Sequence, residues 1–313
     1  KGFAHVRIVG ATSTLAIMSM SRRHLLAGAA AVLVVAGCGD DSSPASGTAA
    51  TPADPTGGSE PDPGTTGFTI AQRYPSNTFV PGAVRLPISL ASKGSLLTTG
   101  PAVLDGRVLD SNNQEIATVS AAIHATDLVI PYWAVNVQID QPGIFTLRLD
   151  GDDGFGAAFM VTDPSAVTVP YIGSLLPPFE TPTVDDHRGV EPYCSLTPDP
   201  CPLHDMTLTQ AMTSGKPVAY MIGTPAHCQT GTCAPGLEFL VKAHDRLGDA
   251  IAMVHADVYA DDAATTIAPA VDALGLDYEP VLYLCGIDGI VKDRIDVVWD
   301  QSELDERLDA FLA

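Results

Sequence analysis

The sequence predicts a multi-domain protein in which an all-β sandwich is followed by an α/β domain. Short apolar runs separated by turn residues fill positions 68–168 and show the two-residue alternation of strands. From about residue 171 onward, strand-like runs alternate with segments of helical periodicity, which is typical of a sheet covered by helices. The chain of 313 residues is long enough for about two ordinary domains.

The charge of the chain is strongly negative and unevenly distributed. The formal net charge is -21 at pH 7, yet the first 37 residues carry four basic side chains and no acidic one. The remainder holds 12 basic against 37 acidic residues. Such a surface repels nucleic-acid phosphates and offers no polybasic patch for anionic lipids, so we expect no nucleic-acid partner.

The first 38 residues have the pattern of an export signal. Met18 or Met20 is a candidate start, which would make residues 1–17 a fragment or an upstream extension. The pair Arg22-Arg23 precedes an apolar run of about 13 residues, shorter than the ~20 that a membrane-spanning helix needs. A basic patch, a short apolar run and small residues before a cleavage site indicate a signal peptide.

The end of this leader, Val35-Ala36-Gly37-Cys38, resembles the lipobox of bacterial lipoproteins. The resemblance implies that Cys38 receives a diacylglycerol on its sulfur, becomes the mature N-terminus and anchors the protein to the extracytoplasmic face of the cell membrane. Arg22-Arg23 with the two leucines that follow is similar to a twin-arginine export signal. The alternative is an ordinary cleaved signal peptide in which the cysteine is incidental.

Residues 39–67 are rich in Pro, Gly, Ser, Thr, Ala and Asp and contain almost nothing to bury. This composition predicts a disordered tether with a root-mean-square span of roughly 30 Å. A tether of that reach would hold a folded domain clear of the lipid headgroups.

Residues 68–168 contain about seven candidate strands, punctuated by turns such as Asn112-Asn113 and Asp150–Gly154. The strands are expected at Phe68–Arg73, Val84–Leu90, Ala102–Leu109, Ile116–Ala121, Asp127–Ile139, Gly143–Leu149 and Gly156–Val161. This pattern is similar to an immunoglobulin-like sandwich of two packed antiparallel sheets, without the inter-sheet disulfide. Tyr132-Trp133 is interpreted as core packing in preference to a ligand-stacking platform. The domain is therefore expected to be a spacer or a partner-binding module.

Residues 171–313 show the order strand, helix, strand, helix, strand, strand, helix. Strands are expected at Pro217–Gly223, Ala250–Tyr259, Pro280–Cys285 and Ile290–Val298, and helices at Pro235–Leu247, Asp262–Leu274 and Ser302–Leu312. The last two strands are predicted to form a hairpin through Asp288-Gly289. Ser302 and Asp305 stand at capping-box spacing before the apolar face of the last helix.

Two motifs of this segment carry a resemblance to a known fold. Paired cysteines, Cys228 and Cys233, end the stretch KPVAYMIGTPAHCQTGTC, and Glu279-Pro280 opens the stretch EPVLYLCGIDGIVKDR. Together they resemble thioredoxin-like proteins of the exported thiol–disulfide oxidoreductase kind. The resemblance implies that the cysteines form a redox-active pair and that Pro280 is cis and faces them. The family separates its cysteines by two residues and this chain by four, so Gly231 is expected to supply an extra bend.

The position of the pair, between a strand and a helix, predicts its chemistry. A helix N-terminus offers unpaired N–H groups and the positive end of the macrodipole, which stabilise a thiolate, the attacking species in disulfide exchange. We expect Cys228 to be the exposed, attacking thiol, with His227 beside it, and Cys233 to lie at the helix start. Glu279 would disfavour a nearby thiolate if its carboxylate points inward.

Two alternatives stay open for this pair. The first is a stabilising disulfide without catalytic use. The second is a Cu(I) site similar to that of Sco copper chaperones, completed by a distant histidine such as His227, His244 or His255.

The other cysteines have simpler interpretations. Cys194 and Cys201 bracket a Pro-rich loop and are expected to form a structural disulfide in an oxidising compartment. The alternative is a zinc site made with the Cys228 and Cys233 pair, with His204 close by. Cys285 lies within an apolar strand and is expected to be a buried small hydrophobe.

The sequence thus predicts a lipid-anchored extracytoplasmic thiol–disulfide oxidoreductase that acts on exported proteins or with a membrane redox partner. It is expected to need no bound cofactor and no metal. The other class is a non-catalytic envelope lipoprotein in which both cysteine pairs are structural disulfides and the sandwich binds a partner. A redox-active pair and a structural disulfide differ in reduction potential, so that measurement separates the two classes.

Overall fold

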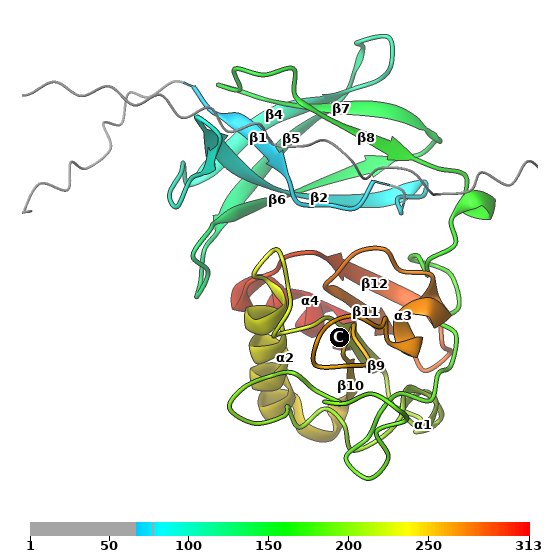
Figure 1. Ribbon diagram of the computed structural model, residues 1–313. Coiled ribbons are helices and arrows are strands. Elements are labelled where there is room, and N and C mark those ends of the chain that lie inside the picture. Colours follow the sequence, from blue (N-terminus) through cyan, green and yellow to red (C-terminus); the bar gives the residue numbers. More distant parts are fainter. Residues whose placement is uncertain (1–66, 77) are drawn as a thin grey trace, which may run out of the picture. The chain divides into compact units, whose positions relative to one another are not determined.

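The computed structural model describes residues 67–76 and 78–313 (Figure 1). The predicted leader (1–38), with Cys38, lies outside the described residues, as does all of the predicted tether except its last residue. Within the described residues, no helix is long and apolar enough to span a bilayer.

The first part of the described chain is an antiparallel sheet of eight strands. They are β1 (Thr69–Gln72), β2 (Gly82–Ser92), β3 (Ser95–Leu96), β4 (Val103–Leu109), β5 (Glu115–His124), β6 (Tyr132–Ile139), β7 (Gly143–Leu149) and β8 (Ala157–Val161). The hydrogen-bonded order is β1-β2-β6-β5-β4-β7-β8, with β3 paired to β2. All seven predicted strands are present, and the sheet curls around one apolar core.

The prediction of two separate sheets needs correction, because β5 belongs to both layers. The first part of β5, to Ala122, pairs with β4, whereas Ile123 and His124 pair with β6. The path also nearly closes on itself, since the side-chain amide of Gln72 on β1 donates to the carbonyl of Ala158 on β8 at 2.9 Å. One continuous, nearly closed sheet therefore encloses the core.

The burial pattern explains why these segments are strands. On β8, Ala157, Phe159 and Val161 are buried while the residues between them are exposed, which is the two-residue period of a sheet with one wet face. On the first half of β6 both faces are covered, whereas Asn136 and Gln138 in its second half are exposed. Trp133 packs inside the curled sheet, and Tyr132 packs on the other side with Val298 of the α/β part. Tyr132-Trp133 is core packing, as expected.

The second part is a four-stranded mixed sheet with helices on both faces. Its elements are α1 (Leu208–Thr213), β9 (Val218–Ile222), α2 (Cys233–Leu247), β10 (Ala252–Ala256), α3 (Pro269–Leu274), β11 (Val281–Cys285), β12 (Val291–Asp296) and α4 (Gln301–Leu312). The strand order is β10-β9-β11-β12, with β10 parallel to β9 and the other neighbours antiparallel. One apolar core lies under α1 and α3, and another under α2 and α4.

The predicted elements follow one another in the predicted order, but the short helix α1 before them was not predicted. The helix predicted from Pro235 begins at Cys233, and two other helix starts need correction. The helix expected from Asp262 begins only at Pro269, because Asp261 accepts hydrogen bonds from the backbone of Thr265 and Thr266 and holds a turn there. The last helix is capped by Asp300, which accepts from the Glu303 N–H at 2.9 Å, and not by Ser302.

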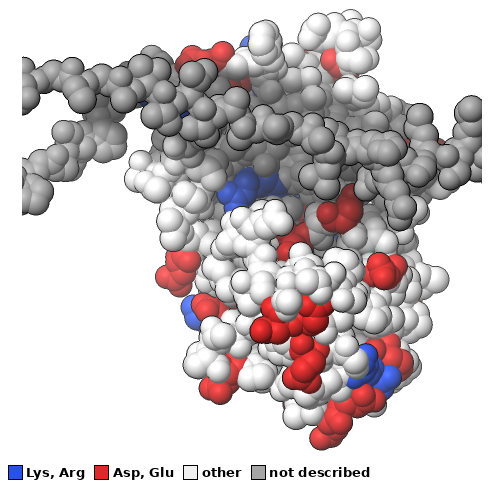
Figure 2. Space-filling view, in the orientation of Figure 1, with Lys and Arg blue, Asp and Glu red and all other residues white. Residues whose placement is uncertain are grey.

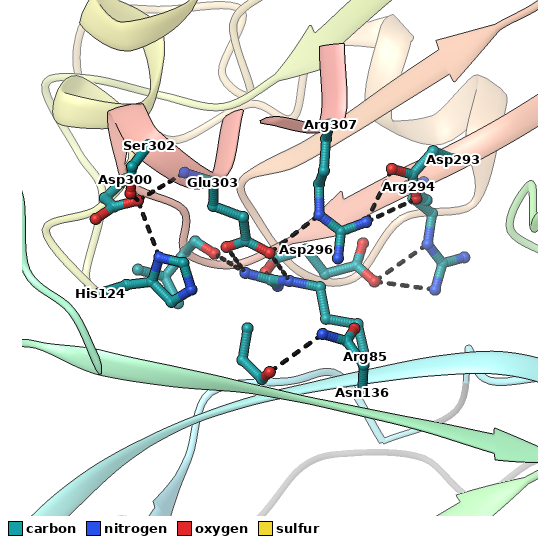
Figure 3. Close-up of polar contacts among 12 residues, drawn as sticks. Arg85, His124, Asn136, Asp293, Arg294, Asp296, Asp300, Ser302, Glu303 and Arg307 are labelled. Atoms are coloured by element: carbon teal, nitrogen blue, oxygen red, sulfur yellow. Dashed lines mark hydrogen bonds and ion pairs between the residues drawn. The ribbon is translucent and has the colours of Figure 1, made fainter. Parts of the chain in front are cut away.

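A buried polar network joins the two parts, which belong to one unit of the chain (Figure 3). Arg85 of β2 donates to both carboxylate oxygens of Glu303 on α4, at 2.7 and 2.6 Å. Tyr132 donates to the same carboxylate, and its oxygen accepts from the Asp300 N–H at 3.0 Å. The ring of His124 contacts Asp300 at 3.1 Å. Bidentate pairing of this kind fixes the orientation of both partners.

The exposed surface is acidic, as the composition indicates. On the face shown in Figure 2, acidic side chains are spread over the lower part, and basic side chains are confined to small patches.

Candidate active site

The loop between β9 and α2 carries the first pair of cysteines. β9 is buried along its whole length, and the chain leaves it at Gly223 and reaches α2 at Cys233. Gly231 has a φ of +67°, a left-handed conformation that suits glycine, so it supplies the expected extra bend. The two sulfurs and one oxygen of Glu279 lie within 4.8 Å of one another.

Cys228 has the environment of a stabilised thiolate. Its side chain is partly exposed, and its sulfur accepts the N–H of Cys233 at the start of α2, at 3.3 Å. The hydroxyl of Thr230 lies 3.2 Å from the same sulfur. The neighbouring Cys233 thiol, the Thr230 hydroxyl and the helix N–H groups lower the pKa of Cys228 to about 4, although burial opposes them.

Cys233 has the opposite environment. It is fully buried, and its sulfur lies 3.5 Å from a carboxylate oxygen of Glu279. Its pKa is raised, because its hydrogen bond to Cys228 favours the protonated thiol and because burial and the Glu279 charge disfavour a second thiolate. The sequence did not decide whether the Glu279 carboxylate points inward, and the structure shows that it does.

Glu279 is itself tuned to the neutral range. Burial raises its pKa to about 7, although the N–H of Thr224 donates to the same oxygen at 2.8 Å. A carboxyl group of this pKa is equally ready to take and to give a proton near neutral pH. It is therefore placed to exchange a proton with the Cys233 thiol.

Pro280 lies across from the cysteines and follows a cis peptide bond, as the resemblance implied. Gly223 stands between them: a Cβ at this position would lie 3.1 Å from the Pro280 Cβ and 3.6 Å from the Cys233 Cβ. The absence of a side chain at Gly223 thus lets the chain that leaves β9 pass between the proline and the cysteine.

The histidines do not complete a metal site with this pair. The ring of His227 packs edge-on against Tyr259, with centroids 5.8 Å apart. His244 lies on α2 beside Asp245, and His255 belongs to another cluster. Among the described residues, the metal-ligating group that joins the two thiols is the Glu279 carboxylate, a hard ligand, whereas Cu(I) prefers soft ones.

A cleft of about 440 Å³ adjoins the loop. Gln229 and Thr230 of the loop line one part of it, and Arg73 and Tyr74, which follow β1, line another. The Arg73 guanidinium feels the charge of a Cys228 thiolate, which opposes the lowering of its own pKa by burial. This basic group and the residues Thr224 and Thr230 are site components that sequence reasoning missed. The local pattern could have suggested only the two threonines, because Thr224 precedes the cysteines closely and Thr230 lies between them.

The remaining cysteines lie apart from this site. Cys285 ends β11 opposite Val218, the first residue of β9, and so occupies the far end of the sheet from the loop. It is fully buried, which raises its pKa to about 12, and it is a core residue as expected. Cys194 and Cys201 are also buried, near His204 and His255.

The structure forms no disulfide among its described cysteines. All five of them, Cys194, Cys201, Cys228, Cys233 and Cys285, are free thiols. The predicted structural disulfide between Cys194 and Cys201 is therefore not formed in the structure, although their sulfurs lie within 4.8 Å of each other.

Comparisons with protein-family models, with curated proteins and with solved structures gave no match.

Proposed function

We propose that this chain is an extracytoplasmic thiol–disulfide oxidoreductase with a thioredoxin-like domain, held at the membrane by a lipid on Cys38. One observation carries the proposal. The partly exposed Cys228 sulfur accepts an N–H at the N-terminus of α2, while the Cys233 thiol is buried and contacts the Glu279 carboxylate. The asymmetry assigns one cysteine to attack and the other to resolution. The strand order, the helices on both faces and Pro280 support the thioredoxin-like assignment.

The reaction follows from these positions. The Cys228 thiolate attacks a substrate disulfide, whose S–S bond breaks; a mixed disulfide forms, and the leaving thiolate takes a proton from water. Cys233 then passes its proton to Glu279 and attacks the Cys228 sulfur. The second substrate sulfur leaves as a thiolate, which takes a proton from water, and the cysteine pair is left as a disulfide after giving two electrons to the substrate. The reverse sequence oxidises a substrate dithiol.

The curled β-sheet has two roles in this proposal. It is a spacer between the tether and the thiol site, and the segment after β1 adds Arg73 and Tyr74 to the cleft. Exported proteins or a membrane redox partner would bind there, since the cleft adjoins Thr230 and Glu279. Neither role needs a cofactor.

The reduction potential of the pair tests the catalytic proposal. After equilibration of the full chain in glutathione buffers, we expect the peptides of Cys228 and Cys233 to change between reduced and oxidised at a potential between roughly -270 and -120 mV, the range of known oxidoreductases. Differential alkylation and mass mapping give this value. Replacement of the core residue Cys285 by Ser is the control and should leave it unchanged. A pair that stays oxidised below about -300 mV would be a structural disulfide and would overturn the proposal.

Lipid attachment is tested separately, at Cys38. In a bacterial host, the unaltered chain is expected in the membrane fraction with an acylated N-terminal Cys38, whereas Cys38→Ala is expected to be unacylated and either uncleaved or released. Intact mass and fractionation measure both properties, with Cys285→Ser as the control that keeps its lipid. A mature N-terminus elsewhere, without acyl mass, would contradict the anchor.

A further inference from the structure

A second cluster of potential ligands lies outside the thiol site. Cys194, Cys201 and His204 come from the loop before α1, and His255 comes from β10, the edge strand of the four-stranded sheet. Their exposed fractions are 3%, 4%, 0% and 0%, so all four side chains are removed from water. One ligand atom from each lies within 4.8 Å of the others.

Backbone carbonyls decide which nitrogen of each histidine carries hydrogen. Nε2 of His255 lies 3.0 Å from the carbonyl of Gly223, and Nδ1 of His204 lies 3.3 Å from the carbonyl of Pro182. A carbonyl oxygen only accepts, so each of these nitrogens is the N–H of its ring. The other two nitrogens therefore present lone pairs.

These two lone-pair nitrogens face each other. Nδ1 of His255 and Nε2 of His204 are 3.2 Å apart, with the two sulfurs beside them: Nδ1 of His255 lies 3.8 Å from Cys194 and 3.7 Å from Cys201. Two acceptors at this distance repel unless a positive charge lies between them. A proton between the rings would satisfy the two nitrogens alone and a disulfide the two sulfurs alone, whereas one metal ion uses all four groups.

The distances between the ligand atoms of the cluster are those expected around a tetrahedral zinc ion. With bonds of about 2.0–2.1 Å to nitrogen and 2.3 Å to sulfur, a tetrahedral zinc site has N–N edges of about 3.3 Å and S–N edges of about 3.6 Å. The observed separations are 3.2 Å for the nitrogens and 3.7 and 3.8 Å for sulfur and nitrogen. The carbonyls behind the histidines correspond to the outer-shell acceptors that orient metal-bound imidazoles.

Charge also selects the metal. Two thiolates and two neutral imidazoles around Zn²⁺ make a site of zero net charge, which is the least costly to bury, while the same ligands around Cu(I) leave one negative charge. Binding releases the two thiol protons to solvent. Four protein ligands fill a tetrahedral ion, so the site has no open position for substrate.

We propose that Cys194, Cys201, His204 and His255 form a structural zinc site that pins the loop before α1 to the edge strand β10. The backbone already links the two, since the His255 N–H donates to the Leu203 carbonyl at 3.1 Å. The site also supports the thiol loop from behind, because the hydroxyl of Ser195, next to Cys194, accepts from the Ala226 N–H at 3.2 Å. The proposal stands whether or not Cys228 and Cys233 are catalytic.

The test is the zinc content of the purified full chain, measured by elemental analysis and native mass. We expect about one zinc per chain, with Cys194 and Cys201 protected from alkylation until a chelator is added. Cys194→Ser and His255→Gln should each reduce the bound zinc to less than a tenth. Two matched controls should keep it: His187→Gln, a histidine of the same loop that packs on Tyr193, and the double variant Cys228→Ser with Cys233→Ser.

A second measurement keeps the proposal falsifiable if a ligand variant fails to fold. The unaltered chain, stripped of metal and loaded with Co²⁺, should show the visible absorption of tetrahedral cobalt together with thiolate-to-cobalt charge transfer. A metal-free protein with a Cys194–Cys201 disulfide would overturn the proposal. So would zinc that survives in Cys194→Ser and is lost in the Cys228 and Cys233 double variant.

Discussion

Alkylation of Cys228 in the reduced protein is expected to proceed at a nearly constant rate from pH 5 to pH 8. With a pKa of about 4, this cysteine is a thiolate over the whole interval. An ordinary thiol, with a pKa of about 8.5, gains roughly tenfold in thiolate for each pH unit and so changes by several hundredfold. Rates read from the Cys228 peptide by mass spectrometry, with the urea-unfolded chain as the control, measure the difference.

The shape of the profile is a better test than the rate at one pH. At pH 6 the thiolate fraction of Cys228 exceeds that of an ordinary thiol by about 300-fold, but a thiolate of low pKa is a weaker nucleophile. With a Brønsted slope of about 0.45, the loss over 4.5 units is about 100-fold, so the net gain is only a few-fold. The weaker nucleophilicity lowers the rate equally at every pH, so the pH dependence of the rate still reports the lowered pKa in full.

Two variants of Cys233 identify the cause. Cys233→Ser keeps a hydrogen-bond donor beside the Cys228 sulfur and should leave the midpoint low, whereas Cys233→Ala removes the donor and should raise it. A midpoint near 8.5 in the unaltered protein would contradict the site as described, because neither the helix start nor its neighbours would then stabilise a thiolate.

Local sequence patterns predicted most of the strands and helices. They did not predict which strands pair, because pairing depends on residues far apart in the sequence. Alternating burial along a strand shows which face is inside, but not which neighbour it pairs with. The prediction of two packed sheets therefore missed that the end of β5, at Ile123, pairs with β6. β3 has two residues and α1 has six, too few to show a period. Asp300 and Ser302 are both good capping residues, and only packing around α4 selects Asp300.

The same limit applies to the sites. Cys228, Cys233 and Pro280 could be found because a strand, a loop and a helix follow in order along the chain. Arg73 lies far before them in sequence and reaches the cleft only through tertiary packing. His255 lies within the apolar pattern of a buried strand. Its position beside Cys201 and His204 depends on how the long loop before α1 crosses β10, which the local sequence does not show.

Removing the charge of Glu303 is expected to cost about 3–5 kcal/mol of the free energy of unfolding, the largest stability effect we predict. Its side chain is 6% exposed and accepts two hydrogen bonds from Arg85, whose own side chain is 8% exposed. In Glu303→Gln the largely buried Arg85 guanidinium keeps its charge but loses the carboxylate that pairs with it. Urea unfolding followed by circular dichroism measures the loss, and the exposed neighbour Glu306→Gln should stay within about 0.5 kcal/mol of the unaltered chain.

The pH dependence identifies the origin of this loss. Burial raises the pKa of Glu303, but the Arg85 charge and hydrogen bonds outweigh burial and lower it to about 2, from 4.5. A carboxyl group with a depressed folded pKa stabilises the fold above its unfolded value and ceases to do so as the pH falls through the folded one. The stability of the unaltered chain should therefore fall between pH 4.5 and pH 2, and the difference from Glu303→Gln should shrink over that interval.

A double variant separates the pair from the packing around it. Arg85→Leu together with Glu303→Leu removes both charges, so no buried ion is left without a partner, and the double variant should be more stable than Glu303→Gln. If Glu303→Gln lies within 1 kcal/mol of the unaltered chain, or if the two-leucine variant is the less stable one, the Arg85–Glu303 contact does not hold β2 against α4. A different contact would then have to hold the segment after β1, with Arg73, beside the thiol loop.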